Sequence, residues 1–308
     1  MEAELELICG HDLATPSADC RTCRLWRTHP RTRKALINRN GQRIVPCGGC
    51  KGNVRLKVPI PPTNGQAAVN GAGLRWACGV TTVPVRRGNL LQHTLASLDN
   101  AGFGDIRLFV DNLDDAAAYA SKIFTPRMGK IGGNLNWYLG LAELYARNPR
   151  AERYAMFEDD LLACRNLRQY LESCPWPGRA WLNLYTCRRN NVLCNGVAGW
   201  YQSDQRGRGA VGLVFDNGSA RAVLEGLPAL GNENPRAYSG ADYGVTTILK
   251  AKEFTEYCHK PSLIQHMGDY SVIRERRHMT GWQYLRAPDF AGEDADAMDF
   301  RPKPGVPV

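Results

Sequence analysis

The chain has 308 residues, of which 44% are hydrophobic and 22% are charged, and its mean hydropathy is −0.38. These values are typical of a soluble globular protein of about two domains, and they exclude a disordered chain. No apolar run approaches the length of about 20 residues that a membrane helix needs. The first thirty residues contain no apolar core of a secretory signal. We therefore expect a cytoplasmic protein with no membrane span.

The net charge of +9 is concentrated near the N-terminus. Residues 1–75 contain twelve Lys or Arg and five Asp or Glu, whereas the remaining 233 residues contain twenty-seven and twenty-five. Between Cys20 and Lys57 there are eleven basic residues and no acidic one. A solvated basic surface would explain this segment, but such segments also bind phosphate-bearing partners. We expect contact with nucleic acid, because the basic residues coincide with a metal-binding motif.

That motif consists of two CxxC pairs, Cys20–Cys23 and Cys47–Cys50, with twenty-three residues between them. Each pair brings two thiolates within reach of one ion, and two pairs complete the tetrahedral sulfur shell of a structural zinc site. Eleven cysteines in a reducing compartment are expected to be thiols or metal ligands. Cys9 and His11 could supply ligands to a second site.

Composition predicts four segments. Residues 1–57 form a basic, Cys-rich, zinc-binding head, and residues 58–75, which are rich in Pro, Gly and Asn, form a linker. Residues 76–285 form the main domain. Residues 286–308 are first acidic and then Pro-rich, and we expect this tail to pack loosely.

Apolar runs and helical periodicity alternate along the main domain. Strands are predicted at Cys78–Val85, Ile106–Val110, Tyr154–Phe157, Ala180–Tyr185 and Ala210–Phe215. Helices are predicted at Asn89–Asn100, along the stripe Trp137, Leu141, Leu144 and Tyr145, and from Phe215 through Leu224. This alternation predicts an α/β domain with a mostly parallel, Rossmann-like sheet and flanking helices.

Three acidic residues, Glu158, Asp159 and Asp160, follow the strand that ends at Phe157, and a helix is expected after Leu161-Leu162. Carboxylates at the carboxyl end of a strand in an α/β sheet lie where ligands bind. Glu158 and Asp160 could face the same side of an extended turn and hold Mg²⁺ or Mn²⁺. Many acidic triplets are only solvated turns, so further signals are needed.

Further signals come from the order of several motifs, because residues 76–275 resemble a GT-A-fold, nucleotide-sugar-dependent glycosyltransferase. The first strand carries Gly79-Val80-Thr81-Thr82-Val83-Pro84-Val85-Arg86, and the second ends in Leu108-Phe109-Val110-Asp111. The acidic triplet corresponds to the D-x-D-type metal motif of such enzymes, with Glu in the first place. A later segment, Pro261-Ser262-Leu263-Ile264-Gln265-His266-Met267-Gly268, resembles a stretch found in several such families.

The resemblance implies a role for each matching residue. The nucleotide-sugar donor, most simply a UDP-sugar, would be bound by Thr81, Thr82, Arg86, Asp111, Glu158 and Asp159. Asp160 and His266 would ligate the catalytic Mn²⁺ or Mg²⁺. For Thr81 and Thr82 strand propensity is an equal explanation, and His266 could be an ordinary buried histidine.

The acceptor side is predicted from position. Trp200, Tyr201, Arg206 and Arg208 precede the strand at Ala210, where such enzymes place acceptor-facing loops, although the two aromatic residues could equally belong to the core. Asp242 lies just before an apolar helical stretch, where inverting enzymes of this fold often hold the catalytic base. It could also be a simple charge at a helix N-terminus.

Taken together, these features predict a metal-dependent glycosyltransferase with a basic zinc-binding head. The leading hypothesis for the acceptor is a hydroxymethylated pyrimidine in DNA, a modification associated with bacterial viruses, with an inverting mechanism. One alternative is transfer to a bacterial surface-glycan precursor at the cytoplasmic membrane face, with the head on anionic lipid. Another is a non-catalytic zinc-ribbon protein that binds nucleic acid. The sequence specifies no oligomeric state.

Overall fold

The computed structural model describes residues 5–8, 53–56, 73–194, 196, 198–233, 240–267 and 286–301. In the N-terminal segment, β1 (Leu5–Ile8) pairs antiparallel with β2 (Asn53–Leu56), and Leu5 lies opposite Leu56. The predicted zinc ligands Cys20, Cys23, Cys47 and Cys50, together with Cys9 and His11, lie outside the described residues. No helix within the described ranges is long and apolar enough to cross a membrane.

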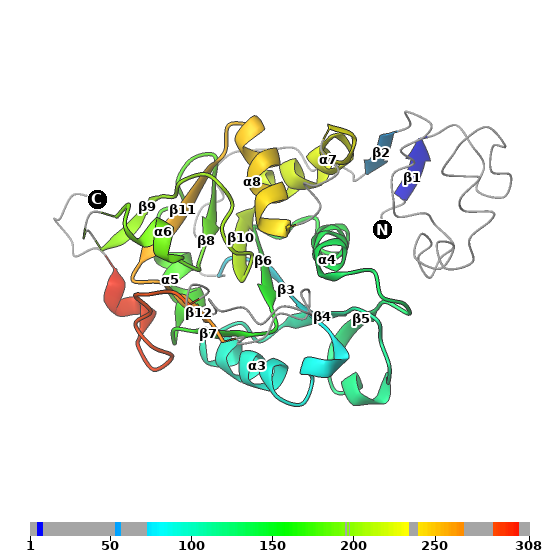
Figure 1. Ribbon diagram of the computed structural model, residues 1–308, viewed down its shortest axis with the longest axis horizontal. Coiled ribbons are helices and arrows are strands. Elements are labelled where there is room, and N and C mark those ends of the chain that lie inside the picture. The colour runs from blue at the N-terminus through cyan, green and yellow to red at the C-terminus, as the bar shows by residue number, and fades with distance from the viewer. Residues whose placement is uncertain are drawn as a thin grey trace, which may run out of the picture.

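The main domain is built on an eight-stranded sheet with the order β5-β4-β3-β6-β10-β8-β11-β9 (Figure 1). The strands are β3 (Trp76–Thr82), β4 (Ile106–Val110), β5 (Ile123–Pro126), β6 (Arg153–Glu158), β8 (Ala180–Asn183), β9 (Gly199–Gln202), β10 (Gly212–Asp216) and β11 (Thr255–Lys260). Four neighbouring pairs are parallel, namely β5 with β4, β4 with β3, β3 with β6, and β8 with β11. The antiparallel strand β10 separates β6 from β8. The predicted α/β class with a mostly parallel sheet is therefore confirmed.

Helices cover both faces of this sheet. Helices α4 (Gly133–Arg147), α7 (Asn217–Glu233) and α8 (Ala241–Ala251) lie on one side, and α3 (Leu90–Asn100) lies on the other (Figure 1). Two short helices, α5 (Leu167–Ser173) and α6 (Arg188–Asn191), complete the domain. The structure also contains the 3₁₀ turns η1 (Pro84–Arg86), η2 (Ala117–Tyr119) and η6 (Ala297–Phe300).

The alternation of side chains along the strands produces two cores. Phe109 and Met156 face α4, whereas Leu108 and Phe157 belong to the core on the α3 side. Because strand residues alternate between faces, a sheet covered on both sides reads as continuous apolar runs. The four stripe residues predicted for α4 are all buried, as a core-facing helix requires.

Glycine brings α4 close to the sheet at one point. A Cβ atom added at Gly140 of α4 would lie 2.8 Å from the Phe109 ring, and one added at Gly79 of β3 would lie 2.6 Å from it. Both positions therefore exclude a larger side chain unless the ring moves. This close packing fixes α4 over the strands whose carboxyl ends carry the acidic residues.

The structure corrects two local expectations. Residues Leu161–Ala163 form an unexpected short strand, β7, which pairs with β12 (Ile264–His266), and the helix expected after Leu161-Leu162 begins only at Leu167. Trp200 and Tyr201 lie on the edge strand β9 instead of in a loop.

The tail also differs from its prediction over residues 286–301. Ala287 and Ala297 are buried, and Asp296 forms a β-bridge with Arg165. The Phe300 ring lies 5.9 Å from the ring of His259. Because this segment satisfies backbone groups and covers core residues, it packs on the domain instead of loosely.

Candidate active site

The acidic residues lie at the carboxyl ends of the central strands. Glu158 is the last residue of β6, and Thr81 of β3 lies beside it in the parallel register. The backbone N–H of Glu158 donates to the carbonyl of Val211 just before β10 at 3.0 Å. The site therefore occupies the edge of the sheet where α/β proteins bind ligands.

The backbone around Asp160 is fixed by the strands β7 and β12 and by helix α3. Asp160 immediately precedes β7, and its carbonyl accepts a hydrogen bond from the N–H of Met267, just after β12, at 2.7 Å. The free edge of β7 is covered by α3, since Leu161 N–H donates to Thr94 Oγ1 at 3.0 Å and Ala163 N–H donates to Ser97 Oγ at 2.9 Å. These hydroxyls replace a missing neighbouring strand. Sequence reasoning missed both of them, because a buried Thr and Ser in a helix have no distinctive pattern.

The pairing of β7 with β12 brings His266 to the acidic residues. His266 lies opposite Leu161, and its Nε2 atom is 3.3 Å from Oδ2 of Asp160. One potential ligand atom each from Glu158, Asp160 and His266 lies within 4.8 Å of the others. Among the described residues, Asp160 Oδ1 and His266 Nδ1 are buried and have no hydrogen-bond partner.

Arg86 binds two of the three carboxylates. Its Nη1 atom donates to Oδ1 of Asp159 at 2.6 Å and to Oδ2 of Asp160 at 2.5 Å. The other oxygen of Asp159 accepts a hydrogen bond from Thr82 Oγ1 at 2.6 Å. The predicted donor-binding residues Arg86, Thr82 and Asp159 therefore form one hydrogen-bonded group beside Asp160.

The acidic residues differ in how readily they ionise. Burial and the neighbouring Asp160 charge raise the pKa of Glu158 to about 8. Burial also opposes ionisation of Asp160, but the hydrogen bond with His266 and the charges of His266 and Arg86 lower its pKa overall. The same contact with Asp160 raises the pKa of His266 against the effect of burial. Asp160 is thus the carboxylate that is prepared to carry charge at neutral pH, and Glu158 would ionise readily once a cation arrived.

Two other predicted donor-binding residues make internal contacts. Both oxygens of Asp111 accept backbone hydrogen bonds, from Ile131 at 2.8 Å and from Gly132 at 2.9 Å. These two hydrogen bonds fix the loop that leads into α4. Thr81 Oγ1 donates to the carbonyl of Phe157 at 3.3 Å, so this hydroxyl links β3 to β6. For Asp111 and Thr81, a role in donor binding stays a prediction.

Asp242 lies in the first turn of α8 and is bound to the loop that precedes β10. Its Oδ2 atom accepts the N–H of Gly209 at 2.6 Å, and its Oδ1 atom accepts its neighbour Tyr243 N–H at 2.8 Å. Gly207 has a φ of +62°, and a Cβ there would lie 2.3 Å from the Asp242 carbonyl oxygen. The same loop reaches Val211, which accepts the backbone hydrogen bond of Glu158. This loop therefore connects Asp242 to the acidic site. The role of Asp242 as the catalytic base stays a prediction.

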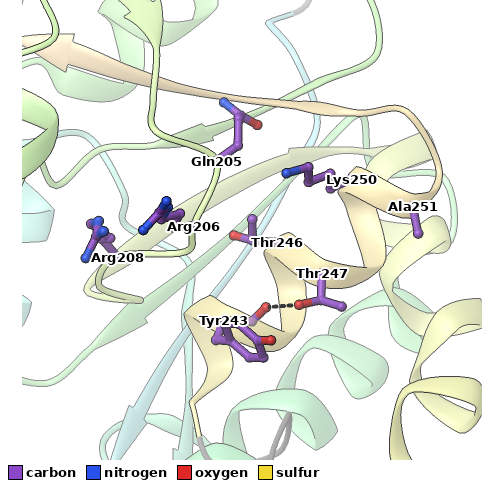
Figure 2. A pocket seen from close by; sticks show the side chains of 8 residues that line it. All are labelled: Gln205, Arg206, Arg208, Tyr243, Thr246, Thr247, Lys250 and Ala251. Carbon is purple, nitrogen blue, oxygen red and sulfur yellow. Dashed lines mark hydrogen bonds between the residues drawn. The ribbon is translucent and has the colours of Figure 1, made fainter. Parts of the chain in front are cut away.

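The structure separates the four residues predicted to bind the acceptor. The Trp200 ring packs on His259 with a centroid distance of 4.9 Å, and the Tyr201 hydroxyl donates to the carbonyl of Asn190 at 3.0 Å. Arg206 and Arg208 instead line a cavity of about 590 Å³ between their loop and α8 (Figure 2). Of the four, the two arginines alone line this cavity.

A buried carboxyl group beneath that loop was not expected from the sequence. Glu256 of β11 is fully buried, and it accepts hydrogen bonds from Ser203 Oγ at 2.5 Å and from Asn183 Nδ2 at 2.9 Å. Burial raises its pKa to about 7. Gln205 is bound to the backbone of Glu256 in both directions. The network holds the loop before β10, and a single Glu in a short strand gave no signal of it.

Comparisons with known proteins do not assign a family. No protein-family model and no curated protein matches the sequence. Among solved structures, the chain is similar to the apo-form glycosyltransferase GlyE of Streptococcus pneumoniae TIGR4, with 12% identity and a TM-score of 0.38. The match covers 60% of this chain and 45% of that one, so it spans less than half of GlyE. Similarity at this level assigns no activity, and any function has to be inferred from the site.

Proposed function

We propose that this chain is a metal-dependent glycosyltransferase that moves a sugar from a nucleotide-sugar donor to a hydroxyl group. The observation that carries the proposal is the convergence of Glu158, Asp160 and His266 at the carboxyl edge of the sheet. Two carboxylates and an imidazole form a donor set that suits Mn²⁺ or Mg²⁺. Asp160 Oδ1, a buried acceptor with no hydrogen-bond partner in the described ranges, would be satisfied by a cation.

Charge balance supports the same proposal. Glu158, Asp159 and Asp160 would carry three negative charges when ionised, whereas the adjacent Arg86 supplies one positive charge. Buried charges without compensation are costly. A divalent cation would balance the two remaining charges, and in its absence Glu158 keeps its proton, in agreement with its raised pKa.

Each part of the site would then have a chemical task. A bound cation supplies positive charge to the diphosphate that departs when the sugar bond breaks. Asp160 and His266 would hold it, with Glu158 in support. Arg86 is near enough to Asp160 to contribute positive charge beside the same phosphates. Asp242 would take the proton of the acceptor hydroxyl in an inverting displacement.

For the acceptor we propose a hydroxymethylated pyrimidine in DNA, and for the donor a UDP-sugar. Support comes from the eleven basic residues between Cys20 and Lys57 and from the predicted zinc-binding motif within them. Such a base would have to leave the stack to reach an active site on a sheet edge.

The proposal is tested by incubating the full-length protein with several nucleotide sugars and with either hydroxymethylated or plain DNA, followed by mass analysis of the nucleosides. We expect a hexose adduct on the hydroxymethylated base only, loss of the adduct in chelator, and recovery with Mn²⁺ or Mg²⁺. Asp160→Asn should be inactive with any addition, and the exposed Asp99→Asn on α3 should behave as wild type. Full activity in chelator would overturn the metal assignment and leave Arg86 as the source of positive charge.

A further inference from the structure

The cavity beside α8 has the residues of a binding site for a phosphate-bearing ligand. Its walls are the loop that carries Arg206 and Arg208 and the side of α8 that carries Thr246 and Lys250 (Figure 2). Three of these four side chains are basic. A cavity of about 590 Å³ is within the range of about 300–1,000 Å³ that small ligands occupy.

Two of the three basic groups form no ion pair within the described part of the chain. Arg208 pairs with Asp204, with 2.5 Å between Nε and Oδ2. Among the residues that the structure describes, the exposed side chains of Arg206 and Lys250 have no ion-pair partner. Lys250 extends its amino group from α8 toward the loop of Arg206 (Figure 2). Both charges are therefore available to a ligand in the cavity, one from each wall.

A second, independent observation comes from the wall of the cavity. Thr246 is 4% exposed, and within the described part of the chain its Oγ1 atom is buried with no hydrogen-bond partner. Leaving a buried hydroxyl without a hydrogen bond is unfavourable. Gly207 covers it closely, since a Cβ at that position would lie 2.8 Å from Oγ1. The wall of the cavity thus contains a buried hydroxyl that has no hydrogen-bond partner among the described residues.

The cavity also has an aromatic wall. Tyr243, one turn before Thr246 on α8, lines the cavity and is 46% exposed. An exposed aromatic ring beside basic side chains is the arrangement that binds single-stranded nucleic acid, because the ring stacks on a base while the cations bind the phosphate.

From these features we infer that the cavity holds one nucleotide of an unpaired nucleic-acid strand. Its phosphate lies between Arg206 and Lys250, and its base lies against Tyr243. The inference rests on the proposed function only in identifying this strand as the acceptor. Asp242 directly precedes Tyr243, which lines the cavity, and the Asp242 carboxylate accepts a hydrogen bond from Gly209 of the same loop. A nucleotide held here would direct the neighbouring nucleotide of the strand toward that carboxylate.

The test is the affinity of the full-length protein for a fluorescein-labelled oligo(dT), measured by anisotropy at several salt concentrations. The double variant Arg206→Gln/Lys250→Gln should bind at least about ten-fold more weakly at low salt, and its salt slope should fall by about 0.7 for each phosphate that is no longer neutralised. Tyr243→Ala should lower the affinity for oligo(dT) at least about five-fold. Tyr243→Phe should bind as wild type, because the ring is kept.

The matched control is Arg150→Gln/Lys122→Gln, which removes the same charge from exposed positions elsewhere. Arg150 precedes β6 and so lies at the opposite edge of the sheet from the acidic site. Equal weakening by the control, or unchanged affinity in the cavity variants, would overturn the inference. If the cavity variants bound oligo(dT) normally but lost binding to anionic phospholipid vesicles, the inference would be overturned in favour of a lipid phosphate.

The experiment separates this inference from the transferase proposal. Oligo(dT) carries no hydroxymethyl group, and its binding needs neither donor nor metal. If Asp160→Asn and wild type bind it equally while the cavity variants do not, the cavity assignment holds even where no sugar transfer is found. If transfer occurs but the cavity variants bind and turn over normally, the transferase proposal holds and this inference fails.

Discussion

Nη1 of Arg86 lies 2.5 Å from Oδ2 of Asp160, while Oδ1 of the same carboxylate is buried with no partner among the described residues. Only one of the two Asp160 carboxylate oxygens is therefore paired with the positive charge of Arg86. The arginine stabilises one oxygen, and the other oxygen remains available to a cation together with Glu158 and His266. Both the stability of the fold and its affinity for metal should depend on this arrangement.

Removing the arginine should destabilise the fold and tighten metal binding. Arg86→Gln leaves Asp159 and Asp160 without their buried counter-charge, which should lower the free energy of unfolding by about 3 kcal/mol. The same variant should bind Mn²⁺ more tightly, because a competing positive charge is gone. Urea unfolding in chelator and calorimetric titration with Mn²⁺ measure the two effects.

Arg87→Gln is the control for that variant. Arg87 is adjacent in sequence and pairs with Asp114 at 3.0 Å on the surface. Exposed pairs contribute little to stability, so this variant should change both measurements much less. Equal destabilisation by the two variants would contradict the role given to Arg86.

The buried Glu256 predicts a pH dependence of stability. Its carboxyl group, with a folded-state pKa of about 7, holds its proton over a range where the unfolded chain has lost it. The folded state binds more protons there, so the free energy of unfolding should fall as pH rises from about 4.5 to about 7 and then level off. Urea unfolding of the wild type across this range measures the fall.

Glu256→Gln should remove that part of the pH dependence, because an amide does not titrate. Glu158 contributes a fall of the same sign, so the comparison is the difference between the two proteins. Identical pH profiles would show that Glu256 ionises normally in the folded protein.

Asp242→Asn should lower kcat by about 10²–10⁴ and leave DNA affinity and its salt dependence unchanged, because a general base acts only on the reacting proton. Steady-state kinetics and DNA-binding titrations measure the two properties separately. A near-normal kcat would favour a retaining mechanism or another base. A parallel loss of affinity would indicate that the Gly209 contact of Asp242 is its main role.

The two CxxC pairs of the N-terminal head predict one tightly bound zinc ion. Elemental analysis of the purified protein should find about one equivalent, and Cys47→Ser should lose the metal together with solubility, since folding and binding are coupled in such sites. Full zinc content in that variant would move the site away from the two CxxC pairs, toward Cys9 and His11.

Long periodic segments were predictable, whereas short pairings were not. The strand Ile106–Val110 and the helix ending at Asn100 were predicted within one residue, because each places apolar residues at a regular period. The strands β7 and β12 have three residues each and no periodicity. Their pairing depends on tertiary contacts, including the Thr94 hydroxyl of α3.

The site itself was partly predictable for the same reason. Asp160 and His266 are far apart in the sequence, and their proximity was expected only from the resemblance of separate motifs to a known family. The bond between Arg86 and both aspartates was not expected, because a sequence pattern does not specify which side chains meet across a sheet edge. The Glu256 network had no local signal.

The proposed chemistry depends above all on Asp160 helping to bind a divalent cation, and calorimetric titration of Mn²⁺ into wild type and Asp160→Asn measures this binding. The measurement requires no knowledge of the sugar or the acceptor. Wild type and the exposed control Asp99→Asn should each show one binding event that Asp160→Asn lacks. Equal Mn²⁺ binding by wild type and Asp160→Asn would contradict the assignment of Asp160 as a metal ligand.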